Sequence, residues 1–231
     1  MHQPNYLPWV GFFDKLRRSD VFVLLDEVQY PRGRSVANRN RIRTANGALM
    51  LTVPVSTPPG SEGKALYRDI RFADLAWRQK HLRTIEQAYA RAQHFDRLYP
   101  ELRALIERID GFCELNVALI RWMAEVLGIP TRIALMSELG TDFGPQNHLI
   151  IGLAAKTGCT EYISGAGGAA YNDAALLAEA GVTLRYQDFQ TPRYPQLGEG
   201  FMPDLSALDM VLNCGRWPGP AAAAIRFDGT A

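Results

Sequence analysis

The chain has 231 residues, of which 47% are hydrophobic and 21% charged, and its 25 Lys and Arg residues nearly balance 24 Asp and Glu residues. This length predicts a single well-buried domain, and a net charge of +1 gives no broad positive field for nonspecific binding to nucleic acid or anionic lipid. The widely spaced cysteines and the lack of an apolar run of roughly 18 residues argue against a disulfide framework and a membrane span, so we expect a cytoplasmic protein.

The N-terminal segment HQPNYLPWVGFFDKL predicts a rigid loop that leads into a helix. Pro4 and Pro8 fix φ and remove backbone donors, while Phe12 and Leu16 recur at helical spacing. A strand normally precedes a loop of this kind, but here Met1 stands directly before it. Either the loop enters without its strand, or several apolar residues precede this Met.

Three strands are predicted in the next part of the chain. Residues 21–25, VFVLL, form a continuous apolar run that ends at two acids, which is typical of a buried parallel strand. Residues 47–55 predict a second strand, which ends at a loop rich in Pro and Gly. Residues 70–72 predict a short third strand.

A central helical segment is predicted from about residue 75 to 127, because apolar positions there recur every three or four residues. We expect its helices at about 77–92, 95–108 and 113–127. Gly128 and Pro130 follow the last of them, which is the usual signal for the end of a helix.

Helices and strands alternate in the remainder of the chain. We expect strands at 131–139, 161–164 and 182–189, and helices at 148–156 and 172–180. Because a helical crossover normally joins parallel strands, this alternation predicts an α/β fold with a mostly parallel, Rossmann-like sheet. The Ala- and Pro-rich tail from about residue 218 is predicted to be flexible.

The first group of candidate site residues lies in the N-terminal loop. His2, Gln3, Asn5 and Tyr6 are polar side chains between prolines, at a predicted strand-to-helix junction. Such junctions are where doubly wound sheets bind ligands, so we expect these side chains in a site. The alternative is a proline-stiffened arm with an exposed His.

The second group lies in the segment DEVQYPRGRSVANRNRIRT. It includes Asp26, Gln29, Asn38, Arg39 and Arg41, and five arginines fall between positions 32 and 43. Guanidinium groups at this density suit bidentate contacts to phosphate or carboxylate, so an anionic substrate group is expected. The alternatives are a solvated β-hairpin face and, less favoured because the net charge is balanced, RNA binding.

Two later segments supply the remaining candidates. In EYISGAGGAAY a predicted strand ends at Ser164 and Gly165, where glycines allow backbone N–H groups to approach an anion; a plain tight turn is the alternative. In FMPDLSALDMVLNCG the spacing of Ser206 and Asp209 also suits a helix N-cap. Gln196, upstream, either lines a site or orders a loop.

The sequence lacks the common motifs of nucleophilic and metal-dependent enzymes. No Ser lies in a GxSxG motif, and His81, His94 and His148 stand on predicted helices without a second ligand at i+4. We therefore predict no metal site, and the residues specify no cofactor.

The informative segments are, in chain order, HQPNYLPWVGFFDKL, VFVLLDEVQY with ANRNRIRT and LTVPV, EYISGAGGAAY, RYPQ and LSALDMVLNCG. Together they resemble the WbqC-like protein family over residues 2 to about 215. The resemblance implies a role in bacterial polysaccharide (O-antigen) and amino-sugar pathways or in secondary metabolism. It also implies the family's characteristic positions, carried over motif by motif: His2, Gln3, Asn5, Tyr6, Asp26, Gln29, Asn38, Arg39, Arg41, Ser164, Gly165, Tyr171, Tyr194, Gln196, Ser206, Asp209, Asn213 and Gly215.

From these residues we expect a transferase that moves an acyl or aminoacyl group to an amine. His2 is the candidate general base because a free imidazole titrates near pH 6.5, and Asp26 would orient it or bind substrate. Arg39 and Arg41 would hold the anionic handle of a sugar nucleotide, an acyl-CoA or a carrier-bound group. The alternatives are an ATP-dependent ligase and a noncatalytic sugar-nucleotide or carrier-binding protein.

Overall fold

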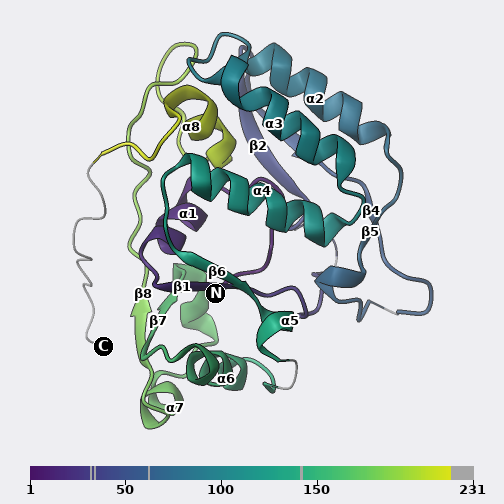
Figure 1. Cartoon of the computed structure of the whole chain (residues 1–231). Coiled ribbons are helices and arrows are strands. Elements are labelled where there is room, and N and C mark those ends of the chain that lie inside the picture. Colours follow the sequence, from purple (N-terminus) through teal and green to yellow (C-terminus); the bar gives the residue numbers. More distant parts are fainter. Residues whose placement is uncertain (32, 34, 62, 141–142, 220–231) are drawn as a thin grey trace.

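The computed structural model describes residues 1–31, 33, 35–61, 63–140 and 143–219 (Figure 1). The predicted tail therefore lies outside the described residues from position 220 onward. The α-helices are α1 Val10–Arg17, α2 Ala76–Tyr89, α3 Phe95–Arg108, α4 Phe112–Val126, α5 Met136–Leu139, α6 Asn147–Thr157, α7 Ala174–Glu179 and α8 Ala207–Cys214. The strands are β1 Val21–Leu24, β2 Arg39–Thr44, β3 Gly47–Thr52, β4 Val55–Ser56, β5 Arg71–Phe72, β6 Arg132–Leu135, β7 Glu161–Ser164 and β8 Thr183–Tyr186.

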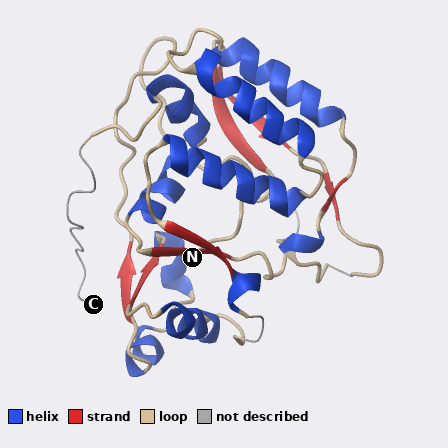
Figure 2. Cartoon of the chain, viewed as in Figure 1, coloured by secondary structure: helices blue, strands red, loops and turns tan. Residues whose placement is uncertain are grey.

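Two of the strand pairs are parallel. β1 pairs with β6 from Val21 opposite Arg132 to Leu24 opposite Leu135, and β7 pairs with β8 from Glu161 opposite Thr183. The strands among the described residues form four two-stranded pairs, which Figure 2 shows as separate red ribbons. The mixed α/β class is therefore confirmed, whereas a Rossmann-like arrangement of one sheet is not.

The other two pairs are antiparallel. β2 and β3 form a hairpin from Arg39 opposite Thr52 to Thr44 opposite Gly47, and β4 pairs with β5. This pair confirms the β-hairpin that was the alternative interpretation of the arginine-rich segment. A strand at β2 was otherwise not predicted, because the alternation of Asn and Arg there lacks the apolar period of a half-buried strand. Ile42 is fully buried in this strand and supplies its contact with the core.

The helices predicted between residues 75 and 127 are present as α2, α3 and α4, with α3 lying beside both others (Figure 1). The main hydrophobic core joins these helices to α1, α8 and the N-terminal loop, and its fully buried residues include Phe13, Leu98, Leu119 and Val211. Gly128 follows α4 with a φ of 68°, a conformation that suits glycine.

The prediction of one strand over residues 131–139 is wrong in its second half. β6 ends at Leu135 and a single helical turn, α5, follows. The Asp26 carboxylate accepts hydrogen bonds from the Ser137 backbone N–H at 3.0 Å and from the Ser137 hydroxyl at 2.5 Å. A carboxylate at the start of a helix satisfies a free N–H group there. Because Asp26 and Ser137 are 111 residues apart, local periodicity could not predict this contact.

Candidate functional site

A cavity of about 420 Å³ lies where the carboxyl ends of β1 and β7 meet α1 and α6. Its lining includes Leu25 and Val28, which follow β1, and Leu149 and Ile150 of α6. The N-terminal loop and helix contribute His2, Gln3 and Lys15, and the segment after β7 contributes Ser164, Gly165, Gly167, Gly168 and Tyr171. We call this cavity the crevice. It brings together His2 and Gln3 of the first group of predicted site residues with Ser164, Gly165 and Tyr171.

His2 enters the crevice from a short backbone pairing with β1. Its backbone N–H donates to Val23 O at 3.0 Å, and its carbonyl accepts from Leu25 N–H at 2.9 Å. Its ring Nδ1 lies 3.0 Å from Gln3 O, and because that carbonyl can only accept, we assign the ring hydrogen to Nδ1. The Nε2 lone pair is therefore available to a ligand.

Burial lowers the pKa of His2 to about 3, with a smaller contribution from the nearby Lys15 cation. The imidazole packs edge-on against Phe12, with ring centroids 5.1 Å apart. His2 was expected to act as general base because a free imidazole titrates near pH 6.5, but His2 does not keep this ordinary pKa in the folded protein. A neutral imidazole with this pKa accepts hydrogen bonds but is a weak proton acceptor near neutral pH.

Lys15, on α1, is a charged residue of the crevice lining that was not predicted as a site residue from the sequence. Its side chain is only 5% exposed, its Nζ donates to Met1 O at 3.1 Å, and it lies 5.8 Å from the Phe22 ring centroid. Burial lowers its pKa to about 8. The available signal was its position three residues after Phe12, on the apolar face of the helix, where a lysine is rarely placed.

Ser164 ends β7 with its side chain fixed by its neighbours. It is 1% exposed, its Oγ accepts from Asn172 Nδ2 at 2.9 Å and donates to Gly165 O at 3.2 Å. A Cβ at Gly168 would collide with the Ser164 hydroxyl, so the turn requires glycine there. Tyr171 is exposed at 62% and forms part of the crevice lining.

Asn5 and Tyr6 do not line the crevice but anchor the N-terminal loop to the core. The Tyr6 hydroxyl lies 3.0 Å from His81 Nδ1, and the Asn5 side chain accepts from the Tyr67 hydroxyl at 3.3 Å. Both residues are buried. At Leu7 the chain turns with a φ of 43°, which is strained for a residue with a Cβ.

The second predicted group is divided between other places. Both oxygens of Asp26 are bonded to Ser137, and the Gln29 side chain donates to Gly63 O at 2.5 Å. Arg39 and Arg41 lie on β2, where their side chains donate to the Ser35 and Asp204 carbonyls respectively. Neither arginine is among the lining residues of the crevice.

Asn38 lines a different cavity of about 640 Å³, together with Tyr30, Val53 and Ser56. The Asn38 Nδ2 donates to Val53 O at 2.8 Å, which ties this part of the loop to the end of β3. Burial raises the pKa of Tyr30 to about 12, and the positive charge of Arg39 offsets part of that rise. The cavity near Asn38 shares no lining residue with the crevice.

Gln196 and the buried Asp209 of α8 belong to one polar network. Asp209 accepts from the Tyr89 hydroxyl and from Gln196 Nε2, each at 2.8 Å, and Arg43 donates to Gln196 Oε1 at 2.8 Å. Burial raises the pKa of Asp209. Ser206 accepts from Leu208 N–H at 3.2 Å as the N-cap of α8, so the capping alternative is confirmed for Ser206.

Within the described part of the chain, no three His, Cys, Asp or Glu side chains come together as a metal site. No helix in that part is long and apolar enough to cross a membrane. The groups that face the crevice are instead an amine, an imidazole, hydroxyls and backbone amides. These groups can bind a polar ligand, accept a proton and stabilise a developing negative charge.

The family model described as the WbqC-like protein family matches residues 3–218 of the chain. A protein of Mycobacterium tuberculosis (strain ATCC 25618 / H37Rv), described as "Uncharacterized protein Rv1507c", is 32% identical over 216 residues. The aligned region covers 92% of each chain. No solved structure matches the chain significantly.

Proposed function

The chain belongs to the WbqC-like protein family, and from this premise we propose that the crevice catalyses transfer of an acyl or aminoacyl group to an amine. The reaction would serve the biosynthesis of glycans, such as O-antigen amino sugars, or of secondary metabolites. The substrate would be a sugar nucleotide, an acyl-CoA or a carrier-bound group, and the protein would act in the cytoplasm. No cofactor is specified.

The proposal depends on one observation, the buried Lys15 amine in a crevice that also contains His2 and Ser164. A lysine whose pKa is about 8 is partly unprotonated near neutral pH, whereas an ordinary lysine is almost wholly charged. It can therefore take a proton from an attacking amine. The pKa of a general base is most effective close to the working pH.

In the proposed reaction the acceptor amine attacks the acyl carbon. A C–N bond forms and the bond from that carbon to the leaving sulfur or oxygen breaks. The proton that the amine loses passes to Lys15 Nζ and then to the leaving group. His2 Nε2 accepts a hydrogen bond from the attacking amine and orients it, because its imidazole stays neutral.

The apolar part of the crevice suits the acyl portion of the donor. Leu25, Val28, Leu149 and Ile150 line it, and apolar walls with a few placed polar groups are typical of small-molecule sites. The segment after Ser164 offers backbone N–H groups for an oxyanion. Arg39 and Arg41 are outside the crevice, so an anionic handle at these arginines would have to extend beyond it.

A first test is a thermal-shift screen of the purified protein against acyl-CoAs, sugar nucleotides, aminoacyl carriers and ATP. A ligand at about 100 times its Kd stabilises a protein by roughly 2.7 kcal/mol, which such a screen detects. Any donor that shifts the melting temperature is then offered with amines, and product is followed by mass spectrometry. A shift with ATP alone would favour the ligase alternative instead.

Three variants separate catalysis from binding. Lys15→Arg keeps the charge but cannot supply a free base, so turnover should fall by at least 100-fold while donor affinity changes little. Lys80→Arg, on the exposed side of α2, is the matched control and should leave both unchanged. His2→Asn should lower turnover more than affinity. Unchanged turnover in Lys15→Arg would contradict the proposed mechanism and leave a noncatalytic binding protein as the better explanation.

A further inference from the structure

The β2–β3 hairpin presents an apolar strand edge to solvent. β3 pairs with β2 on one side, and no described strand pairs with its other side. Natural sheets usually protect an open edge with a charged side chain, a proline or a bulge, because such an edge recruits further strands. β3, with the sequence GALMLT, has none of these features. Its Leu49 and Met50 side chains are 43% and 47% exposed.

The contacts of β2 show which backbone groups of β3 point away from the hairpin. Arg43 N–H donates to a hydroxyl on α2 at 3.0 Å, and Arg41 O accepts from Ser206 N–H at 2.8 Å. Arg41 and Arg43 therefore direct their backbone groups away from β3. Met50 and Ala48 lie opposite them, so these two residues direct theirs away from β2. Among the described residues, no other backbone group bonds to these outward N–H and C=O groups.

The opposite edge of the hairpin is closed. The bonds from Ser206 and from α2 cover the outer edge of β2, and Figure 1 shows β2 behind α2 and α3. The hairpin thus offers one open edge. Pairing through a single edge of this kind stops at two copies, whereas two open edges would allow a filament.

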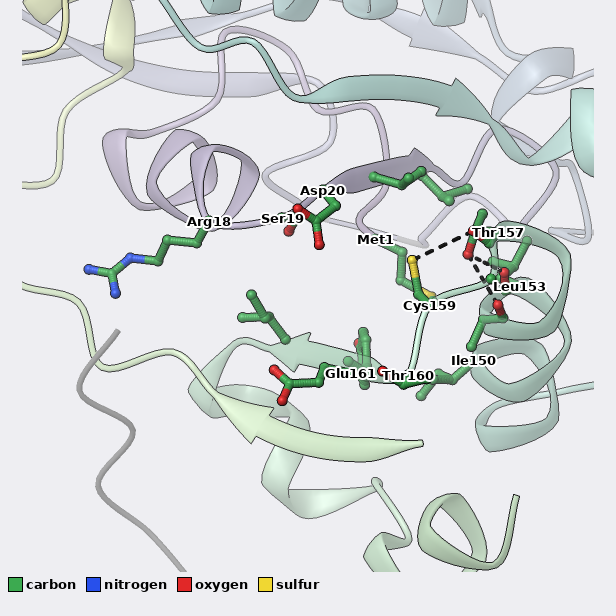
Figure 3. Close-up of a pocket in the computed structure, with 16 residues that line it drawn as sticks. Met1, Arg18, Ser19, Asp20, Ile150, Leu153, Thr157, Cys159, Thr160 and Glu161 are labelled. Carbon is green, nitrogen blue, oxygen red and sulfur yellow. Dashed lines mark hydrogen bonds between the residues drawn. The ribbon is translucent and has the colours of Figure 1, made fainter. Parts of the chain in front are cut away.

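The edges of β1 and β7 are different, because they lie on either side of a cavity of about 430 Å³. Figure 3 shows Met1 and Cys159 in the space between these two strands. Side chains of α6, including Leu153 and Thr157, also line this cavity. The edge of β3 is instead bordered by exposed side chains.

We propose that β3 is the interface of a symmetric homodimer, in which the β3 strands of two copies pair antiparallel about a two-fold axis at Leu49. In this register Ala48 lies opposite Met50 of the partner subunit, and Met50 lies opposite Ala48 of the partner subunit. All the outward N–H and C=O groups of these residues then find partners. A small side chain faces a large one in both pairs.

Charge favours a second copy over a charged peptide at this edge. β3 has no charged side chain, so it offers no counter-charge to an acidic or basic strand. The nearest arginines, Arg41 and Arg43, lie on β2. Strands are about 4.8 Å apart, which places the two β2 strands roughly 14 Å from each other. This separation exceeds the Debye length of about 8 Å at physiological ionic strength, so their repulsion is largely screened.

The register also defines where the pairing ends. Asn46 of the partner subunit, in the hairpin turn, would lie opposite Thr52, whose backbone already bonds to the His81 ring. Thr52 is one of the lining residues of the cavity near Asn38. Each hairpin turn would therefore lie at the rim of that cavity in the other copy. Because six residues bury a small area, we expect a micromolar Kd, as in transient complexes.

The first test is analytical ultracentrifugation of the full chain from about 1 to 200 μM, where a monomer–dimer equilibrium is expected. Leu49→Lys and Leu49→Asp each place like charges directly opposite one another, so the dimer Kd should rise at least tenfold in each variant. An equimolar mixture of the two variants should recover dimers, because opposite charges then face each other. Leu75→Lys, at a side chain that is 53% exposed outside the hairpin, is the matched control and should dimerise normally.

Cysteine cross-linking tests the register in a second way. Residues at the two-fold axis have Cα atoms about 4.5 Å apart, within the range of a disulfide, so Leu49→Cys should form a covalent dimer on mild oxidation. Ala48→Cys should not, because the two copies of residue 48 are diagonal to each other. The unsubstituted protein, with Cys159 and Cys214 partly exposed, is oxidised in parallel as the control.

The dimer does not depend on the reaction proposed for the crevice. A monomer at every concentration would overturn the proposal and leave the β3 edge to a different protein partner. Dimers that persist in Leu49→Lys would place the interface elsewhere. Failure of the mixed variants to recover dimers, or equal cross-linking at positions 48 and 49, would overturn the two-fold register. Urea midpoints establish that each variant is folded before it is compared.

Discussion

At the scale of single residues, Lys15 is the side chain whose environment departs most clearly from what its type suggests. A lysine on a helix is normally solvated, but this one is enclosed between α1 and the first residues of the chain. The energetic consequence is a cost of charging Lys15 in the folded state. That cost can be measured without knowing the substrate.

We expect the Lys15→Met variant to change how stability depends on pH. The pKa of Lys15 falls from 10.5 to about 8 on folding, so between these values the unfolded chain binds more protons and the unsubstituted protein gains stability as the pH rises. The free energy of unfolding of the unsubstituted protein should increase relative to that of Lys15→Met by about 3 kcal/mol across this range. Urea titrations from pH 7.5 to 10.5 measure the difference. Parallel pH profiles for the two proteins would show that Lys15 is not desolvated.

Tyr6→Phe should destabilise the protein without affecting the crevice. The substitution leaves His81 Nδ1 without the Tyr6 hydroxyl in a buried position, which should cost about 1–3 kcal/mol. Chemical denaturation measures this loss, and the affinity for any ligand found by the screen should stay within twofold. A tenfold loss of affinity at unchanged stability would show instead that Tyr6 contributes to ligand binding.

At the scale of elements, two short segments are held by contacts distant in sequence. α5 depends on Asp26, which follows β1, and the loop at residues 194–202 depends on Arg43 of β2 and Asp209 of α8. In both cases a buried or partly buried charge satisfies backbone or amide groups of another element.

Asp26→Ala should loosen α5. Removal of the acceptor leaves the Ser137 N–H and hydroxyl without their partner, and the loss should be about 0.5–2 kcal/mol, as for a helix cap. Hydrogen exchange in residues 136–139 should accelerate. Asp26→Asn keeps one acceptor oxygen and should show a smaller effect; equal exchange in all three proteins would argue against capping by Asp26.

Asp209→Ala should release the loop at residues 194–202 from α8. The buried Tyr89 hydroxyl would lose its acceptor and the Gln196 amide one of its acceptors, which should cost about 1–3 kcal/mol. Limited proteolysis within this loop should become faster. Unchanged proteolysis and stability would show that the network is dispensable.

At the scale of the whole molecule, the balanced charge predicts weak interaction with polyanions. A net charge of +1 supplies few phosphate contacts, so binding to a random single-stranded RNA at physiological salt should show a Kd on the order of 10⁻⁵ M or weaker. Filter binding at several salt concentrations tests this, with the Arg39→Ala and Arg41→Ala double variant as control. Submicromolar binding that this variant abolishes would support the RNA alternative.

The sequence by itself determined the family, the mixed α/β class and the position of most helices and of the apolar strands such as β1 and β3, because hydrophobic periodicity and motif order are local properties. It also identified His2, Ser164 and Gly165, which the fold brings to one crevice. Only the tertiary structure decided which candidates share that crevice and which, such as Asp26 and Asp209, are bonded to other elements. Tertiary structure likewise sets the pKa values of His2 and Lys15, since desolvation depends on neighbours that lie far away in the chain.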